Sequence, residues 1–163
     1  VKASRPIKDA CFVFVGGGTA SEIVEKANRT REYENLLFIP PMPKDEYDQF
    51  VYACDVGLIF LNHDCLAPNY PSRLLSYMQA GLPVICATDT YTDVGRIAEI
   101  NGYGLSCESN DTKQFVNCVF SMMNEDRRKT MGELAHNYFI DNYTSDTSFR
   151  IIMNHLISKE KSR

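Results

Sequence analysis

The 163-residue sequence contains no apolar run that approaches the roughly 18 residues needed to span a membrane. It also has no excess of positive charge, since 17 Lys and Arg stand against 21 Asp and Glu, for a net charge of −4. Basic residues gather only in the tail at 159–163. This balance argues against a protein that binds nucleic acid through phosphate contacts. We therefore expect neither a membrane span nor a nucleic-acid partner.

The six cysteines lack the spacing of a metal site. They stand at positions 11, 54, 65, 86, 107 and 118, and no two are close enough to form a zinc knuckle. Cys11, Cys86 and Cys107 lie in or beside apolar runs, where cysteine acts as a small core residue. Cys65 lies in a polar stretch and is the candidate for reactivity. We expect a reducing compartment, no disulfide framework and no bound metal.

Common catalytic motifs are missing as well. The three glycines at 16–18 lack the spacing of a dinucleotide fingerprint, no serine lies in a nucleophile elbow, and no phosphate-loop lysine motif occurs. His63 and Asp64 invite a general-base role, but an adjacent pair of this kind in a loop is more often structural or solvated. None of these patterns assigns a catalytic residue.

Short apolar runs alternate with helical patterns along the chain. The predicted strands are 11–15, 36–39, 56–61, 84–87 and 103–107, and the predicted helices are 19–29, 43–54, 72–80, 93–100, 111–123, 126–141 and 145–160. Continuous apolar strands are typical of parallel sheets buried on both faces. The predicted fold class is therefore α/β, a Rossmann-like doubly wound parallel sheet with helices on both faces and C-terminal helices appended.

Ligands of such sheets bind beyond the carboxyl ends of the strands. The loops at 16–18, 40–42, 62–72 and 88–92 all fall on that edge. The glycines allow close backbone approach to a phosphate or sugar, although a turn without any ligand explains them equally well. Tyr70 can stack on a base or sugar, or pack half-buried against the protein.

The segment from Asn69 to Ile85 is the most informative in the chain. Pro71 ends a loop, and Ser72 stands at a helix N-cap, where its hydroxyl can accept from an amide two or three residues on. A helix N-terminus that follows a loop suits a phosphate. Arg73 can supply the cation that a pyrophosphate needs, or be an ordinary surface arginine. Ser76 shares the helix face of Ser72 and contacts either a ribose or solvent.

The motifs in this order resemble the C-terminal, nucleotide-sugar-binding domain of GT-B glycosyltransferases of the large retaining family 4. The resemblance covers nearly the whole chain and rests on the stretches 12–18, 37–42 with 45–57, 71–85 and 102–105. It implies that residues 1–163 form a single nucleotide-sugar-binding domain, the C-terminal half of a GT-B enzyme truncated at its N-terminus. The implied activity is retaining transfer from a UDP- or GDP-sugar in polysaccharide or glycan synthesis.

The resemblance also implies a binding site without a cofactor and without a required metal. Pro41 and Met42 would lie near the base, Ser72, Arg73 and Leu74 near the phosphates, and the glycine turn beneath the donor. The predicted donor-binding residues are Gly16, Gly17, Gly18, Pro41, Met42, Tyr70, Ser72, Arg73, Leu74 and Ser76.

Two departures from the family leave alternatives open. The two glutamates that the family carries eight positions apart fall on Pro68 and Ser76, so the donor-sugar contact is in question. This favours, as an alternative, a catalytically degenerate nucleotide-binding or interaction module. A UDP-sugar 2-epimerase-like domain is a further alternative, but it would need more acidic and histidine residues at the binding edge than His63.

The second departure is truncation. The family's cationic pair and acceptor site would lie before residue 1, so we expect no catalytic residue here and no transfer by this fragment alone. Its partners would be the nucleotide-sugar donor and the missing N-terminal GT-B domain. We expect a cytoplasmic location, with peripheral membrane association only in the full-length protein. Without that domain, Phe149, Ile152 and Leu156 should be exposed and promote self-association.

Overall fold

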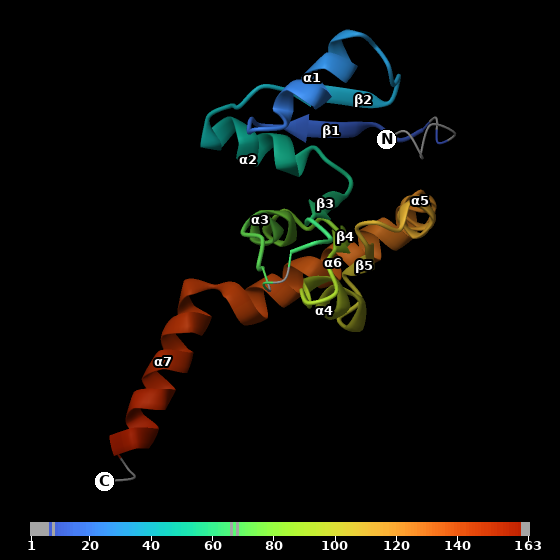
Figure 1. Cartoon of the computed structure of the whole chain (residues 1–163). Coiled ribbons are helices and arrows are strands. Elements are labelled where there is room, and N and C mark those ends of the chain that lie inside the picture. The colour runs from blue at the N-terminus through green and yellow to red at the C-terminus, as the bar shows by residue number, and fades with distance from the viewer. Residues whose placement is uncertain (1–6, 8, 66, 68, 161–163) are drawn as a thin grey trace.

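The computed structural model describes residues 7, 9–65, 67 and 69–160, except for the side chains of 158–160. Strands and helices alternate as the sequence pattern predicts, at nearly the predicted boundaries (Figure 1). Their order is β1 (Phe12–Val15), α1 (Ser21–Arg29), β2 (Leu36–Ile39), α2 (Lys44–Tyr52), β3 (Gly57–Phe60), α3 (Arg73–Gln79), β4 (Val84–Thr88), α4 (Val94–Ile100), β5 (Gly104–Glu108), α5 (Thr112–Ser121), α6 (Glu125–Tyr143) and α7 (Ser145–Glu160).

The parallel strands form two separate hydrogen-bonded ladders. One pairs β1 with β2, and the other has the order β3-β4-β5. The predicted α/β class with parallel strands and flanking helices is therefore confirmed, and the ladder is interrupted between β1 and β3. In Figure 1 the β1–β2 pair lies above with α1 and α2, while β3–β5 lie below among α3 to α6.

The lower sheet holds most of the buried side chains. Every residue of β4 is buried, because α3 and α4 cover one face while α5 covers the other. Ile85 and Ala87 join the cluster that includes Phe115 and Met122. Val84 and Cys86 join the opposite cluster. A strand buried on both faces explains the continuous apolar run read in the sequence.

Two glycines permit close packing around this sheet. A Cβ on Gly57, at the start of β3, would lie 2.3 Å from Tyr77 Cδ2, so only glycine lets the Tyr77 ring lie against the strand. A Cβ on Gly132 in α6 would lie 2.1 Å from Gly81 O, in the turn between α3 and β4. These contacts fix α3 and α6 against the sheet and so position the loop before α3.

Of the three cysteines predicted to lie in the core, two are buried and one is exposed. All six are free, and Cys86 and Cys107 are buried, which raises the pKa of each thiol to about 12. The prediction that Cys11 belongs to the core is wrong, because it is exposed. The ladder of β1 begins only at Phe12, so the residue before it is not enclosed by the sheet.

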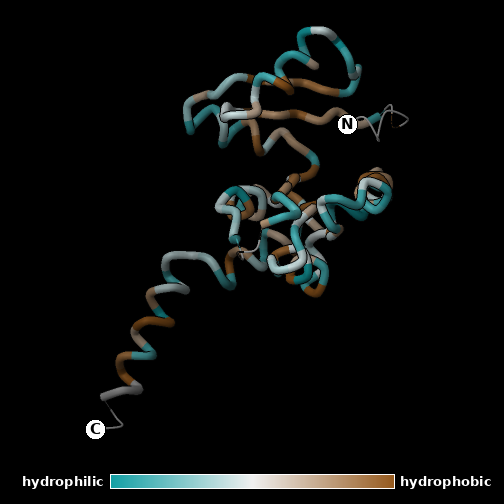
Figure 2. Tube along the Cα trace, viewed as in Figure 1, coloured by the Kyte–Doolittle hydropathy of each residue, from teal (hydrophilic) through white to brown (hydrophobic). Residues whose placement is uncertain are grey.

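The last helix extends away from the rest of the molecule (Figures 1 and 2). Figure 2 shows apolar positions spaced along α7, and the predicted exposure of Phe149, Ile152 and Leu156 is confirmed. Within the described part of the chain, no helix combines the length and the apolar character that crossing a membrane requires.

Candidate functional site

The loops at the carboxyl ends of the strands contact one another in pairs, as predicted for a binding edge. After β1 and β2, Gly17 and Pro41 lie together, since a Cβ on Gly17 would be 3.4 Å from Pro41 Cγ. In the lower sheet, Asn69 N donates to Thr92 Oγ1 over 3.3 Å and joins the loop before α3 to the loop after β4. The binding edge is thus built from two groups of loops, one on each ladder.

The glycine turn has the geometry of an open backbone surface. Gly16 N donates to Ile39 O over 3.1 Å, and Gly16 has a φ of 128°, a conformation that favours glycine. Apart from its neighbours in the chain, no heavy atom of the described residues lies within 4 Å of where a Cβ on Gly16 or Gly18 would be. Ser21 N and Oγ both donate to Gly18 O, at 3.1 and 2.8 Å, which holds the end of the turn. The turn therefore offers backbone with free space around it.

Ser72 stands at the N-cap of α3, but its predicted hydrogen bond is absent from the described part of the chain. Its backbone is helical, with φ −56° and ψ −28°, and its side chain makes no cap contact. A capping side chain needs an extended backbone to reach back to the helix amides. The first turn closes instead through Leu74 N to Pro71 O and Leu75 N to Ser72 O, at 2.9 and 3.1 Å. The exposed Ser72 hydroxyl is left available to a ligand.

The other predicted residues of α3 differ in burial and surroundings. Leu74 is fully buried in the core cluster that includes Val84 and Cys86 of β4, and it fixes the start of the helix there. Arg73 is exposed and lines a cavity together with Val15, at the end of β1. Ser76 is half-buried and faces Tyr52 in a narrow cleft against α2. Arg73 therefore borders, together with Tyr77 of the same helix, the cavity that β1 also lines.

Tyr70 is engaged with the protein as well as partly exposed. Its ring centroid lies 5.7 Å from that of Tyr143 at the end of α6, and Tyr143 in turn lies 5.9 Å from Tyr138. Burial and the neighbouring Tyr143 hydroxyl raise the pKa of Tyr70 above its usual value. The residue as a whole is 42% exposed. The aromatic contact fixes the loop before α3 from one side.

Asp89 holds the loop after β4 from the inside. Its side chain is buried, and its carboxylate accepts from the amides of Tyr91 and Thr92 and from Thr92 Oγ1, each at 2.8 Å. Burial raises the pKa of this carboxyl, but the bonds from Thr92 and Tyr91 outweigh burial and hold the pKa below its usual value. Asp89 thus stays ionised and shapes the loop to which Asn69 is bound.

His63 does not pair with Asp64 in the described structure. Asn110 Nδ2, after β5, donates to His63 Nε2 over 3.0 Å. A ring nitrogen that accepts leaves the proton on Nδ1, which is buried without a partner among the described atoms. His63 therefore joins the loops after β3 and β5, which favours the structural alternative over a general base.

Sequence reasoning missed Thr92 and Asn110, the partners that connect these loops. Each is a polar residue in the loop that follows a strand, so their position on the binding edge could have been read from the strand pattern. The residues to which they bond could not be read from the pattern, because Asn69 lies 23 residues from Thr92 and His63 lies 47 residues from Asn110. Pro68, one of the two positions that depart from the family, lies outside the described residues. Among the residues described, no group of three or more His, Cys, Asp or Glu could hold a metal ion.

Comparison with known proteins relates this geometry to glycosyltransferases. No protein-family model matches the sequence. The chain is 24% identical over 155 residues to the Pseudomonas aeruginosa protein named Probable glycosyltransferase WbjE, and the match covers 93% of this chain and 38% of WbjE.

Solved structures with a similar fold cover nearly the whole chain. Anabaena HepE in complex with UDP matches with a TM-score of 0.74 at 16% identity, over 96% of this chain and 43% of HepE. TarM matches with a TM-score of 0.71 at 13% identity, over 94% of this chain and 30% of TarM. WaaG, a glycosyltransferase involved in lipopolysaccharide biosynthesis, matches with a TM-score of 0.59 at 16% identity, over 82% of this chain and 34% of WaaG.

These likenesses establish the fold. The resemblance to the C-terminal domain of GT-B glycosyltransferases, predicted from the sequence motifs, is confirmed at this level. The chain spans about two fifths of the length of WbjE and HepE.

Proposed function

We propose that this chain, which has the fold of the C-terminal half of GT-B glycosyltransferases, binds the UDP- or GDP-sugar donor of such an enzyme. The observation that carries the proposal is the arrangement at the binding edge: Val15, which directly precedes the open glycine turn, and Arg73 at the exposed start of α3 line one cavity. HepE, whose structure was solved in complexes with UDP and with UDP-glucose, has the same fold. We extend the proposal to the longer protein as a retaining glycosyltransferase of polysaccharide or glycan synthesis.

In this proposal the start of α3 and Arg73 hold the diphosphate. The amides of Ser72 and Arg73 precede the hydrogen-bonded turns of α3, and Arg73 is exposed toward this cavity. Amides at a helix start and a guanidinium both favour the charge that develops on a diphosphate leaving group. With these groups in place we expect no metal requirement. Ser72 Oγ, which makes no cap bond, can donate to the same phosphates.

The base would lie at the upper ladder, against the turn after β2. Gly17 packs on Pro41, and Met42 follows half-buried. An exposed proline ring beside a glycine backbone forms a flat apolar surface of the kind on which a base can lie. Transfer also requires an acceptor site, which we expect in the rest of the longer protein, so we expect no activity from residues 1–163 alone. The free cysteines support a cytoplasmic enzyme.

Nucleotide binding tests the proposal. Saturation-transfer NMR with UDP, GDP, ADP and CMP in competition should give a selective signal for UDP or GDP. Arg73→Ala should weaken binding about 10-fold or more, because charge-assisted hydrogen bonds contribute about 1.5–3 kcal/mol. Arg150→Ala, an exposed arginine on α7, is the matched control and should bind like the unchanged chain.

The outcomes separate the proposal from its alternative. Equal signals for all four nucleotides, or binding that Arg73→Ala leaves unchanged, would contradict the proposed site. No signal with this chain or with the longer protein would favour a degenerate interaction module, in line with a proline and a serine at the two family glutamate positions.

A further inference from the structure

The loop before α3 is contacted from the end of α6. The Tyr70 ring, two residues ahead of Ser72, has its centroid 5.7 Å from that of Tyr143, the last residue of α6. Burial and then the Tyr143 hydroxyl raise the pKa of Tyr70 above its usual value, so the two hydroxyls lie close together as well as the two rings. This contact joins the loop to a segment that is distant in the sequence.

Tyr143 belongs to a row of aromatic rings that begins in the core. Tyr103, which is 1% exposed and belongs to the core cluster of β4, has its ring centroid 5.0 Å from that of Tyr138 in α6. The Tyr138 ring lies 5.9 Å from the Tyr143 ring in an edge-on arrangement. These centroid distances are those of favourable aromatic pairs. The row therefore connects the core of the lower sheet to the Tyr70 ring.

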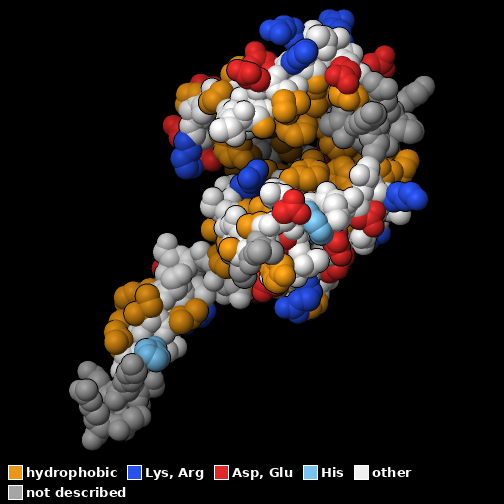
Figure 3. Space-filling model, in the orientation of Figure 1, with side chains coloured by type: hydrophobic (Ala, Val, Ile, Leu, Met, Phe, Trp, Pro, Cys, Tyr) orange, Lys and Arg blue, Asp and Glu red, His pale blue; other side chains and the backbone are white. Residues whose placement is uncertain are grey.

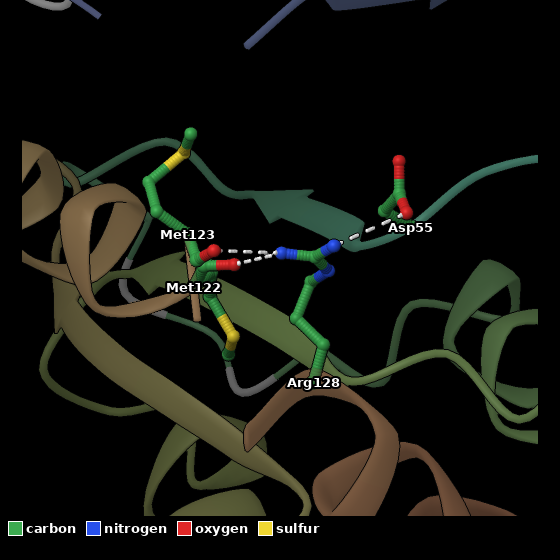
Figure 4. Close-up of polar contacts among 4 residues, drawn as sticks. All are labelled: Asp55, Met122, Met123 and Arg128. Atoms are coloured by element: carbon green, nitrogen blue, oxygen red, sulfur yellow. Dashed lines mark hydrogen bonds and ion pairs between the residues drawn. The ribbon is translucent and has the colours of Figure 1, made fainter. Parts of the chain in front are cut away.

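The helix that carries Tyr143 is fixed along its length. Figure 4 shows Arg128 near the start of α6 donating to two carbonyls after α5, at 2.8 and 3.2 Å, with its other terminal nitrogen 3.6 Å from Asp55 Oδ1. In the middle of the helix, Gly132 packs against the turn after α3, and Ala135 is fully buried in the core cluster. α6 therefore presents Tyr143 from a rigid support.

The turn that follows Tyr143 is held by hydrogen bonds. Thr144 has an extended backbone, with ψ 156°, and its Oγ1 accepts from Thr147 N over 3.2 Å at the start of α7. Thr147 is 8% exposed, and its Oγ1 accepts from Thr144 Oγ1 at 3.0 Å and donates to Ile140 O at 3.5 Å. Beyond this turn, α7 extends away from the remaining atoms of the molecule (Figure 3). The end of α6 is thus kept in one geometry where Tyr143 meets the loop.

The position of Tyr70 is passed on to the start of α3. Pro71 alone separates Tyr70 from the helix N-cap; it is buried, and its carbonyl accepts from Leu74 N over 2.9 Å. A proline has a fixed φ, so the backbone between the ring and the helix has little freedom. On the other side of Tyr70, Asn69 N donates to Thr92 Oγ1 over 3.3 Å. A displaced Tyr70 ring would therefore also displace the amides at the helix start.

We propose that Tyr143 is a positioning residue for the donor site: through Tyr70, it holds the loop before α3 and the amides at the helix start in the conformation that binds the diphosphate. Tyr143 acts without contacting the donor. A loop that is already ordered loses less conformational entropy when a ligand binds, so this contact raises affinity by preorganisation. The inference rests on the proposed function, because it assigns to Tyr143 a part in donor binding.

A double-mutant cycle on nucleotide affinity tests this role. With UDP and GDP as ligands, Tyr143→Leu should weaken binding of the preferred nucleotide about 5-fold, as expected for the loss of an aromatic pair. Tyr143→Phe keeps the ring and should restore most of the affinity. In a Tyr70→Leu background, Tyr143→Leu should have no further effect, because its influence passes through the Tyr70 ring. Phe120→Leu, which changes an exposed aromatic residue on α5, is the control and should leave the affinity unchanged.

Backbone order in the free chain provides a second readout. NMR order parameters of the Asn69 and Tyr70 amides should be about 0.85 in the unchanged chain and fall below about 0.6 in Tyr143→Leu. The Cys86 amide in the buried strand β4 should stay rigid in both proteins, which shows that the fold is intact. Saturating nucleotide should restore the order of the loop, because the ligand then supplies the contacts that Tyr143 no longer makes.

The outcomes distinguish this inference from the proposed function. An equal loss of affinity from Tyr143→Leu with and without the Tyr70 ring would mean a general effect on stability and would overturn the inference. Affinity or loop order that Tyr143→Leu leaves unchanged would overturn it as well, while nucleotide binding itself still stood. If neither this chain nor the longer protein bound UDP or GDP, the proposed function would fail, and the role of Tyr143 in donor binding would fail with it.

Discussion

At the scale of single residues, the binding edge is organised by buried polar side chains rather than by the exposed residues that would meet a ligand. Asp89 is 3% exposed and accepts three hydrogen bonds within its own loop. Thr92, which donates to it, accepts in turn from Asn69 N. The loop before α3 therefore depends on the ionised state of a buried carboxylate.

The lowered pKa of Asp89 predicts a specific loss of stability in acid. Because its folded pKa lies below the usual 3.8, the carboxylate contributes stability above that pH and loses the contribution as the pH falls through the folded pKa. Asp89→Asn should lower Tm at pH 7 and narrow the difference in Tm between pH 7 and pH 3. Thermal melts by circular dichroism at the two pH values measure both effects.

Asp93→Asn is the matched control, because Asp93 is an exposed carboxylate at the start of α4 without a side-chain cap bond. It should keep the pH dependence of the unchanged chain. If Asp89→Asn also kept that dependence, the carboxylate would not be the group that links the loop to pH.

At the scale of elements, the close approach of α6 to the turn after α3 sets the position of the helix that starts at the binding edge. Gly132 makes this approach possible, since a Cβ there would meet the carbonyl oxygen of Gly81. Gly81 itself has a φ of 70° and ends α3. A change in the spacing between α6 and this turn would shift α3 and its N-terminus.

Gly132→Ala should destabilise the protein despite the better helix propensity of alanine. Alanine favours a helix by about 1 kcal/mol, but forcing a methyl group to within 2.1 Å of a backbone oxygen costs up to about 3 kcal/mol, so we expect a net loss of up to about 2 kcal/mol. Urea unfolding measures the change. Asn137→Ala, at an exposed position of the same helix, should be neutral or stabilising. A Gly132→Ala protein as stable as the unchanged chain would mean that α6 moves aside at no cost.

Local pattern predicted the elements well, and the contacts between them poorly. The apolar run of β4 and the glycine and proline that follow α3 identify their elements because each reflects a local cause, burial or backbone geometry. The predicted cap hydrogen bond of Ser72 was wrong because the backbone of this residue is helical. That conformation depends on how the preceding loop packs, which the local sequence does not show. The predicted burial of Cys11 was wrong, because the residue at which a strand ladder starts depends on where the partner strand begins. The bond between His63 and Asn110 was out of reach, since it joins loops far apart in the chain.

At the scale of the whole molecule, α7 presents apolar side chains that the remainder of the chain does not cover. Phe149 is 65% exposed, Ile152 59% and Leu156 53%, and they recur at the spacing of one helix face. We predicted this exposure from the sequence, on the expectation that these residues pack against a domain that is absent from residues 1–163. An uncovered apolar face favours association with another surface.

We therefore predict that residues 1–163 self-associate through α7. Sedimentation equilibrium should show a mass that rises with concentration, and replacing Phe149, Ile152 and Leu156 together by serine should give a monomer. Ile100→Ser is the control, because Ile100 is 70% exposed on α4 and should leave association unchanged. A monomer at all concentrations of the unchanged chain would contradict the prediction.

The interrupted sheet also bears on the order in which the chain folds. Two paired strands are marginal in water on their own, whereas β3–β5 possess three strands and a core on each face. The β1–β2 unit contacts that core where Phe12 packs with Phe115. We therefore expect the lower sheet to form first and the glycine turn to become ordered only after the Phe12 ring has docked onto it.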